Sequence, residues 1–182
     1  MTILALWLPI LVSAVFVFVV SAVIWMAMPW HKSDFSKTSD EEGVRSALRG
    51  HGPGFYLLPY CIDPKELKDP EVQKKFVDGP QAYITVLPNG VPQMGPKMAM
   101  SFVYYVFVGI ICAYVLSRTV GPDASYLTVF RITGTAAFVA YGIAYIQDSI
   151  WFGRPWSITA KSLFDALIYA LLTGGAFGWL AT

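Results

Sequence analysis

The residues of this sequence that could do chemistry are the few charged side chains inside or beside its apolar segments. Four of them fall within a short stretch near the C-terminal end: Asp148, Arg154, Lys161 and Asp165. A charge within a membrane span is costly, so each such residue is a candidate functional group. Residues of these types can bind an ion, a proton or a lipid headgroup.

Two interpretations of this set stay open. Lys161 and Asp165 are one helical turn apart, which predicts a mutual ion pair and an interfacial cluster that fixes the connection at 148–161. The alternative is an entry site for an ion or a proton. Neither carboxylate is expected at the middle of the bilayer, where pumps and symporters usually bind their substrates, and this disfavours those two classes.

Arg131 is a further charge, about one turn into an apolar segment. One interpretation is that its long side chain extends to the nearby membrane surface. The other is that it binds an anionic lipid or a substrate carboxylate, or forms an ion pair inside the bundle.

Metal and cofactor chemistry has little support in the residue pattern. A membrane haem would need histidines inside the spans, whereas His31 and His51 both fall in a long polar segment. The potential metal ligands of that segment lack a metal-binding spacing; they are His31, Asp34, His51 and Cys61. We therefore expect no metal and no cofactor, and we expect His31 between Trp30 and the lipid headgroups. No hydrolase, dehydrogenase or nucleotide-binding motif occurs in the sequence.

The composition indicates what holds these residues. Of the 182 residues, 55% are hydrophobic and 14% are charged, against roughly 25% charged in soluble domains. Four apolar runs reach about the 20 residues that a membrane span needs; they are residues 3–28, 98–116, 127–146 and 163–181. The predicted fold is an all-α integral membrane protein, a bundle of four transmembrane helices in contact with the lipid bilayer. The net charge of +1 gives no reason to expect a nucleic-acid partner.

Small residues recur at every fourth position in three of the four spans, and so line one face of each helix. In lipid, such faces let helix backbones approach closely. The predicted packing residues are Gly109 and Ala113, then Ala136, Ala140 and Ala144, and finally Ala166, Ala170, Gly174 and Gly178. These faces predict a compact bundle, and one of them could serve a neighbouring chain.

The segment 29–97, of about 68 residues, carries nine of the 13 Lys and Arg and nine of the 12 Asp and Glu, and is therefore solvated. We expect an irregular α+β loop within a single membrane domain, 1–182, because the segment has too few apolar residues for its own core. A helix is predicted from a capping box at Ser39 to Arg49. The other expected elements are helical turns at 64–68 and 70–77, a strand at 81–87, and an apolar stretch at 54–60 that could pair with it or contact the membrane surface.

Basic residues predict the orientation of the chain. One side of the membrane has Lys32, Lys37, Lys97, Arg154 and Lys161 near the span ends, and the other has Arg118 and Arg131. The positive-inside rule then places the long loop and 148–161 in the cytoplasm and both termini outside it. The tryptophans agree with this arrangement, because all six fall at predicted membrane boundaries: Trp25, Trp30, Trp151 and Trp156 on the loop side, and Trp7 and Trp179 on the other.

Several strings at the two ends of the chain resemble those of small four-helix bacterial membrane proteins of unknown function. They are WLPILVSAVFVFVVSAVIW, MPWHKSDF, FGRPW and LLTGGAFGWL. The resemblance implies a location in the bacterial inner (cytoplasmic) membrane, and it carries over no functional residue.

Three functional hypotheses follow. The small-residue faces favour a non-enzymatic multi-pass membrane protein that acts by helix packing, as a homo-oligomer or as an accessory, structural subunit beside other membrane subunits. The alternative is a small transporter or channel with a charged cytoplasmic mouth made by Asp148, Arg154, Lys161 and Asp165, which predicts an aqueous cavity that reaches Asp165. A membrane enzyme or redox subunit is the third, and a bound cofactor would be its sign.

Overall fold

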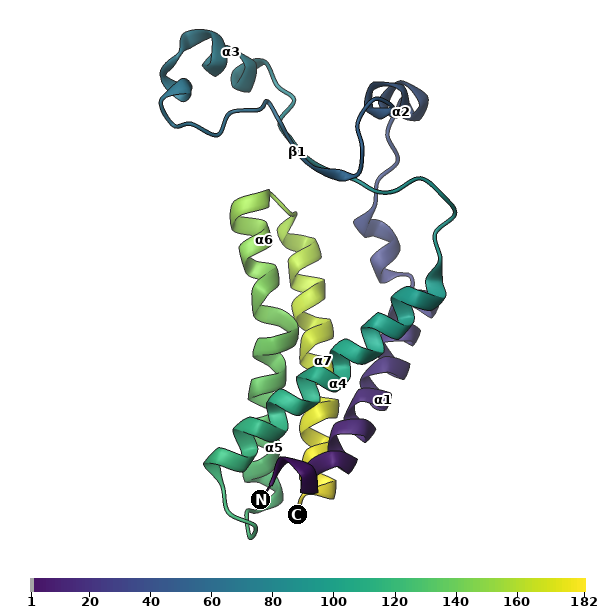
Figure 1. Ribbon diagram of the computed structural model, residues 1–182, viewed down its shortest axis with the longest axis vertical. Coiled ribbons are helices and arrows are strands. Elements are labelled where there is room, and N and C mark those ends of the chain that lie inside the picture. Colours follow the sequence, from purple (N-terminus) through teal and green to yellow (C-terminus); the bar gives the residue numbers. More distant parts are fainter. Residues whose placement is uncertain (1) are drawn as a thin grey trace. The chain divides into compact units, whose positions relative to one another are not determined.

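The computed structural model describes residues 2–182, and within them four long apolar helices pack together (Figure 1). The four spans are Ile3–Ala27, Met94–Thr119, Tyr126–Phe152 and Trp156–Leu180. An α+β segment lies between the first span and the second. This arrangement confirms the predicted fold class. Each helix exceeds the roughly 20 residues that cross a bilayer.

The first span is made of three helical pieces in succession. A 3-10 turn, η1 (Ile3–Leu6), leads into α1 (Trp7–Ala22), and the helix then widens into a π turn, η2 (Val23–Ala27). The span ends at Pro29, because proline cannot donate a helix hydrogen bond and drives the preceding residue to an extended conformation. A second 3-10 turn, η3 (Trp30–Asp34), follows directly and packs against the fourth span.

The third span contains the same kind of irregularity. It runs from α5 (Tyr126–Phe138) through a π turn, η5 (Val139–Ile143), into α6 (Ala144–Phe152). Gly153 then adopts the left-handed conformation at φ 66°, which suits a glycine at the end of a helix.

The fourth span is one uninterrupted helix, α7 (Trp156–Leu180), which follows Pro155. The helix begins seven residues before the span predicted at 163–181. The polar residues of its first turns lower the hydropathy, which set the predicted start, but they are compatible with a helix. Asp165 therefore lies nine residues into α7, about 14 Å along its axis.

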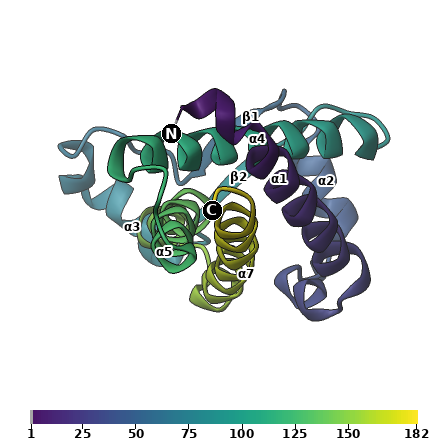
Figure 2. The ribbon, with the colours of Figure 1, turned by 90° about the horizontal axis from the view of Figure 1, so that it is seen from below.

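The small residues of the spans are used for packing within the chain. α7 packs along α5 and α1, and α4 (Met94–Thr119) packs along α1 and α5 (Figure 2). A Cβ atom at Gly174 would lie 2.9 Å from the carbonyl oxygen of Phe130, and one at Gly109 would lie 3.1 Å from the side chain of Ile10. Helix α7 therefore approaches α5, and helix α4 approaches α1, as closely as their backbones allow. The core between them includes Val17, Val108, Leu116, Val129 and Phe177.

The chain divides into two compact units, one formed by Met1–Phe35 with Gln93–Thr182 and the other by Ser36–Pro92. The second unit contains α2 (Glu41–Leu48), β1 (Gly54–Leu58), η4 (Glu66–Lys68), α3 (Pro70–Asp78) and β2 (Ala82–Val86). The two strands pair antiparallel, with Gly54 opposite Val86 and Leu58 opposite Ala82. All residues of this unit are described, and none of them is fully buried.

The N-cap of α2 differs from the prediction. Asp40, not Ser39, precedes the helix, and its Oδ1 accepts a 2.8 Å hydrogen bond from the backbone N–H of Gly43. Glu42 instead pairs with the side chains of Arg45 and Arg49. The predicted capping box was wrong because an aspartate one residue later competes for the same backbone N–H groups.

Candidate functional site

His31 occupies the centre of a buried cluster of ionisable side chains. It lies in η3, is 4% exposed, and contacts a carboxylate with each ring nitrogen. Nδ1 lies 2.6 Å from Oδ2 of Asp34, and Nε2 lies 2.8 Å from Oδ2 of Asp165. Asp34 is three residues along the same 3-10 turn and so lies on the same face as His31. The imidazole thus joins the turn that follows the first span to the first half of the fourth.

Lys161 completes the cluster from α7. Its Nζ donates three hydrogen bonds, to the carbonyl oxygen of Trp30 at 2.7 Å, to Oγ of Ser33 at 2.8 Å and to Oδ1 of Asp34 at 2.5 Å. An ammonium group has three donors, so the bonding capacity of Lys161 is filled. These contacts fix η3 against the helix that carries Asp165.

The charges of the cluster balance when His31 carries both ring protons. The two cations, His31 and Lys161, then face two carboxylates, Asp34 and Asp165, which is the pairing that buried charges require. Burial by itself would raise the pKa of Asp34, but the hydrogen bonds from Lys161 and His31 outweigh it and lower that pKa below its ordinary value.

Two tryptophans enclose the imidazole. The indole of Trp25, in the π turn η2, stacks on the ring of His31 with centroids 3.9 Å apart and planes inclined by 3°. Trp30 meets the same ring edge-on at 5.6 Å. Two indoles and two carboxylates therefore surround the His31 ring.

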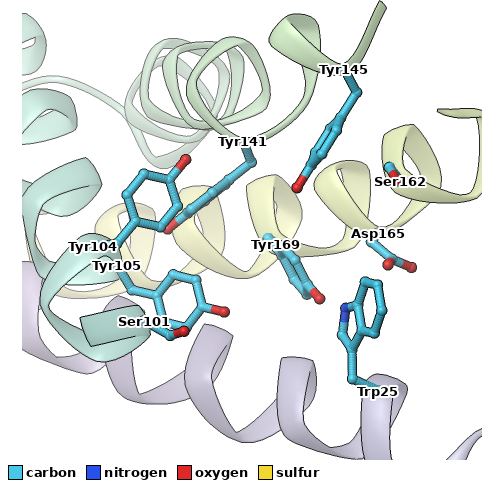
Figure 3. A pocket seen from close by; sticks show the side chains of 9 residues that line it. All are labelled: Trp25, Ser101, Tyr104, Tyr105, Tyr141, Tyr145, Ser162, Asp165 and Tyr169. Carbon is cyan, nitrogen blue, oxygen red and sulfur yellow. The ribbon is translucent and has the colours of Figure 1, made fainter. Parts of the chain in front are cut away.

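A cavity of about 280 Å³ lies beside the cluster, between the four spans (Figure 3). Its lining residues are Trp25, Ser101, Tyr104, Tyr105, Tyr141, Tyr145, Ser162, Asp165 and Tyr169. Two buried polar atoms of this lining, Oδ1 of Asp165 and the hydroxyl of Tyr169, make no hydrogen bond of ordinary geometry to any described residue. Buried polar atoms in proteins nearly always have a hydrogen-bond partner, because leaving one without a partner costs free energy. These two atoms therefore call for a functional explanation.

The tyrosines of the cavity form a connected group. The rings of Tyr105, Tyr141 and Tyr169 contact one another with centroids 5.7 to 6.4 Å apart. The hydroxyl of Tyr104 donates to the carbonyl oxygen of Ala140 in the π turn η5, at 2.9 Å. The turn that carries Tyr141 into the cavity is therefore held by a neighbouring tyrosine, and π turns of this kind recur at functional sites.

The structure separates the four charged residues singled out in the sequence. Asp148 pairs with Arg154 at 3.4 Å at the end of α6, where both side chains are partly exposed, and neither lines the cavity. Lys161 and Asp165 belong to the buried cluster, but the predicted ion pair between them is wrong, because Lys161 binds Asp34 and Asp165 binds His31. The prediction failed because η3 brings partners that helical spacing cannot reveal.

His31 is the residue that sequence reasoning misplaced. The expectation of a histidine among lipid headgroups is wrong, since the side chain is buried and doubly hydrogen-bonded. The available signal was local: a histidine and an aspartate three residues apart, directly after a proline that ends a span. That spacing places both side chains on one face of a short turn.

Arg131 lies on the outer surface of α5 and makes no ion pair within residues 2–182. It borders two apolar grooves, one shared with Leu167 and Leu171 of α7 and one with Val115 of α4. Its position is separate from the buried cluster and from the cavity that Asp165 lines.

The predicted packing residues occupy different environments. Those on α4 and α7 are buried: Gly109, Ala113, Ala166, Ala170, Gly174 and Gly178. On the third span, Ala136 and Ala140 are half-buried and Ala144 is exposed. The buried face of that span is instead formed by Val129, Thr133, Ala137 and Tyr141.

Comparisons with protein-family models, with curated proteins and with solved structures found no match for this chain. Among the described residues, no group of three or more His, Cys, Asp and Glu side chains is placed to hold a metal ion. The fold itself defines the class: the chain is a multi-pass membrane protein with four candidate spans in residues 2–182.

Proposed function

We propose that this chain is a small transporter or channel that admits a small polar solute to the cavity at Asp165. The observation that carries the proposal is a buried carboxylate, one oxygen of which has no partner in residues 2–182, in the wall of a cavity between all four spans. Ionisable residues within membrane spans usually mark the path or the binding site of a solute.

Two features of the helices support this role. The cavity is concave and largely aromatic with a few convergent polar groups, which is the usual character of a small-molecule site. Its walls include residues from both π turns, Trp25 in η2 and Tyr141 in η5. Irregular turns in membrane helices are tolerated where they line a cavity or are buried in protein.

The charged mouth suggested by the sequence is revised in this proposal. Asp165 belongs to the solute site and Lys161 to its support, whereas Asp148 and Arg154 form a separate pair. Asp165 lies about 14 Å from the start of its helix, where it contacts His31 of the turn that follows the first span.

Helix packing with another chain remains the second candidate, and one specific observation favours it. Ala136, Ala140 and Ala144 of the third span are not fully covered by the chain's own helices, so they could meet a second copy or another membrane subunit. Packing with another chain has less support than solute transport, because the small-residue faces of α4 and α7 already pack against helices of the same chain.

We further propose that the protein resides in the inner membrane of a bacterium, with the 29–97 loop in the cytoplasm and both termini outside it. The Lys and Arg distribution supports this orientation. Figure 1 shows the two ends of the chain at the same end of the helix bundle, as an even number of spans requires.

Solute entry into proteoliposomes tests the proposed function. Vesicles are mixed with hyperosmotic solutions of tetramethylammonium chloride, ethanolamine, glycerol, urea or sodium acetate, and their reswelling is followed by stopped-flow light scattering. At least one solute should enter faster with protein than without, and Asp165→Asn should slow that entry to the rate of empty vesicles. Asp148→Asn, at a carboxylate outside the cavity, is the matched control and should behave as the native protein. If no solute distinguishes native from empty vesicles, the proposal is wrong.

A further inference from the structure

We infer that the solute of this cavity is a small organic cation, an amine or quaternary ammonium compound whose charge lies near Asp165 and among the aromatic rings. The inference rests on the proposed function and names its substrate class.

The charges around the cavity select against an anion. The two nitrogen-bearing side chains of the cluster are already engaged, Lys161 on Asp34, and His31 on both Asp34 and Oδ2 of Asp165. Among the nine described lining residues, Asp165 is the one carboxylate, and none is Lys or Arg. Tyrosines ionise only near pH 10. The lining therefore offers a solute one carboxylate oxygen, Oδ1 of Asp165, that has no hydrogen-bond partner in residues 2–182, and no cationic side chain that could bind an anion.

The aromatic rings supply the second half of the recognition. Six of the nine lining side chains are aromatic, one tryptophan and five tyrosines, and they come from all four spans. In Figure 3, Trp25 and Tyr169 lie beside the Asp165 carboxylate, and Tyr145 approaches from the third span. Aromatic faces attract cations, most strongly where water is excluded, and cages of such rings recognise quaternary ammonium groups.

The chemistry of the lining distinguishes an organic cation from a metal ion. Calcium requires about six to eight oxygen ligands, and the cavity offers one carboxylate with scattered hydroxyl groups. An ammonium ion needs fewer oxygens, because its methyl or methylene groups contact the rings directly. The cavity volume of about 280 Å³ lies just below the range of roughly 300 to 1,000 Å³ for drug-sized ligands, so a compact cation fits best.

Binding of radiolabelled choline to the full-length protein in nanodiscs tests the inference. Choline should bind saturably and be displaced by tetramethylammonium. The neutral compound of the same shape, 3,3-dimethylbutan-1-ol, should not displace it at the same concentration. Asp165→Asn should abolish binding and Asp148→Asn should leave it unchanged. Equal displacement by the neutral compound, absence of saturable binding, or displacement by sodium or calcium alone would each overturn the inference.

Ring substitutions separate an aromatic contact from a structural effect. Tyr169→Phe keeps the ring and should retain choline affinity, whereas Tyr169→Leu should weaken it on the order of tenfold. The same pair at Tyr145, which is less buried, provides a second comparison if the first leucine variant does not fold. Equal losses in the Phe and Leu variants would contradict recognition by the rings.

The two proposals can fail separately. Entry of glycerol or acetate that depends on Asp165, without choline binding, would remove the organic cation and leave the transport role intact. Choline binding without entry of any solute into vesicles would remove the transport role and leave a cation-binding membrane protein.

Discussion

His31 shows how a single residue can organise a site formed by distant parts of the chain. Its ring contacts Asp34 three residues away and Asp165 on the last helix, and Trp25 stacks on its face. Because the histidine takes only Oδ2 of Asp165, the other carboxylate oxygen is left without a partner among the described residues. We therefore regard His31 as a positioning residue and Asp165 as the residue that meets the solute.

Asp34 should make the stability of the protein depend on pH. Its pKa is lowered in the folded state by the hydrogen bonds from Lys161 and His31, which exceed the opposing effect of burial. The ionised form is then favoured by folding, so its stabilisation is complete above the ordinary aspartate pKa of about 3.9 and is lost as the pH falls through the lower folded value. At neutral pH, Asp34→Asn should lower the free energy of unfolding by on the order of 3 kcal/mol.

Thermal unfolding in detergent, followed by tryptophan fluorescence between pH 3 and 8, measures this effect. The difference in melting temperature between the native protein and Asp34→Asn should be constant above about pH 5 and shrink below about pH 4. Asp148→Asn removes a partly exposed ion pair and should cost less than about 1 kcal/mol. A difference for Asp34→Asn that grows on acidification would contradict the account.

At the level of residues, the sequence revealed which side chains matter better than it revealed their partners. Lys161 and Asp165 stand out because they are charges near an apolar run. Their partners could not be inferred, since His31 is 134 positions from Asp165 and helical periodicity describes only neighbours on one helix. The tyrosines of the cavity were hidden for a similar reason: an aromatic residue in a span fits a lipid-facing surface as well as a cavity wall.

The elements of the bundle owe their close approach to glycine. A Cβ atom at Gly174 would lie 2.9 Å from the Phe130 carbonyl oxygen and 3.3 Å from Cα of Gly134, so α5 and α7 would have to separate. The neighbouring Gly175 provides a control, because a Cβ there meets nothing within 4 Å.

Gly174→Ala should destabilise the protein by roughly 1 to 3 kcal/mol, the usual cost of overpacking. Gly175→Ala should be neutral or stabilising by up to about 1 kcal/mol, because alanine is the better helix former. Unfolding titrations with dodecyl sulfate in mixed micelles measure both variants. Equal destabilisation by the two substitutions would show that the close contact between α5 and α7 does not control stability.

Element boundaries were predictable only where the sequence carries a strong stop signal. Pro29 ends the first span as its chemistry requires. The strand expected at 81–87 is β2, and it pairs with β1 in the apolar stretch at 54–60, which was one of the two alternatives for that stretch. The π turns at Val23–Ala27 and Val139–Ile143 had no signal in the hydropathy, because an extra residue in a helical turn changes geometry without changing composition.

On the scale of the whole molecule, the orientation proposed from basic residues predicts the outcome of fusions in a bacterial host. Alkaline phosphatase joined after Thr182 should be active, since that enzyme requires the space outside the cytoplasm. The same enzyme inserted at the exposed turn Asn89–Gly90 should be inactive. An inactive fusion after Thr182 together with an active fusion at Asn89–Gly90 would show that the orientation is the opposite of the one proposed. The tyrosine-lined cavity would then lie toward the other side of the membrane.

The most direct test of the central claim is whether water-borne reagents reach the cavity at Asp165. Ser162 lines the cavity and is 5% exposed, and Ser13 is buried at 2% on α1 away from it. In a Cys61→Ser background, Ser162→Cys in proteoliposomes should react with an impermeant methanethiosulfonate reagent supplied from one side of the membrane, and Ser13→Cys should not. If neither cysteine reacts from either side, or if both react alike, the cavity is not a solute site.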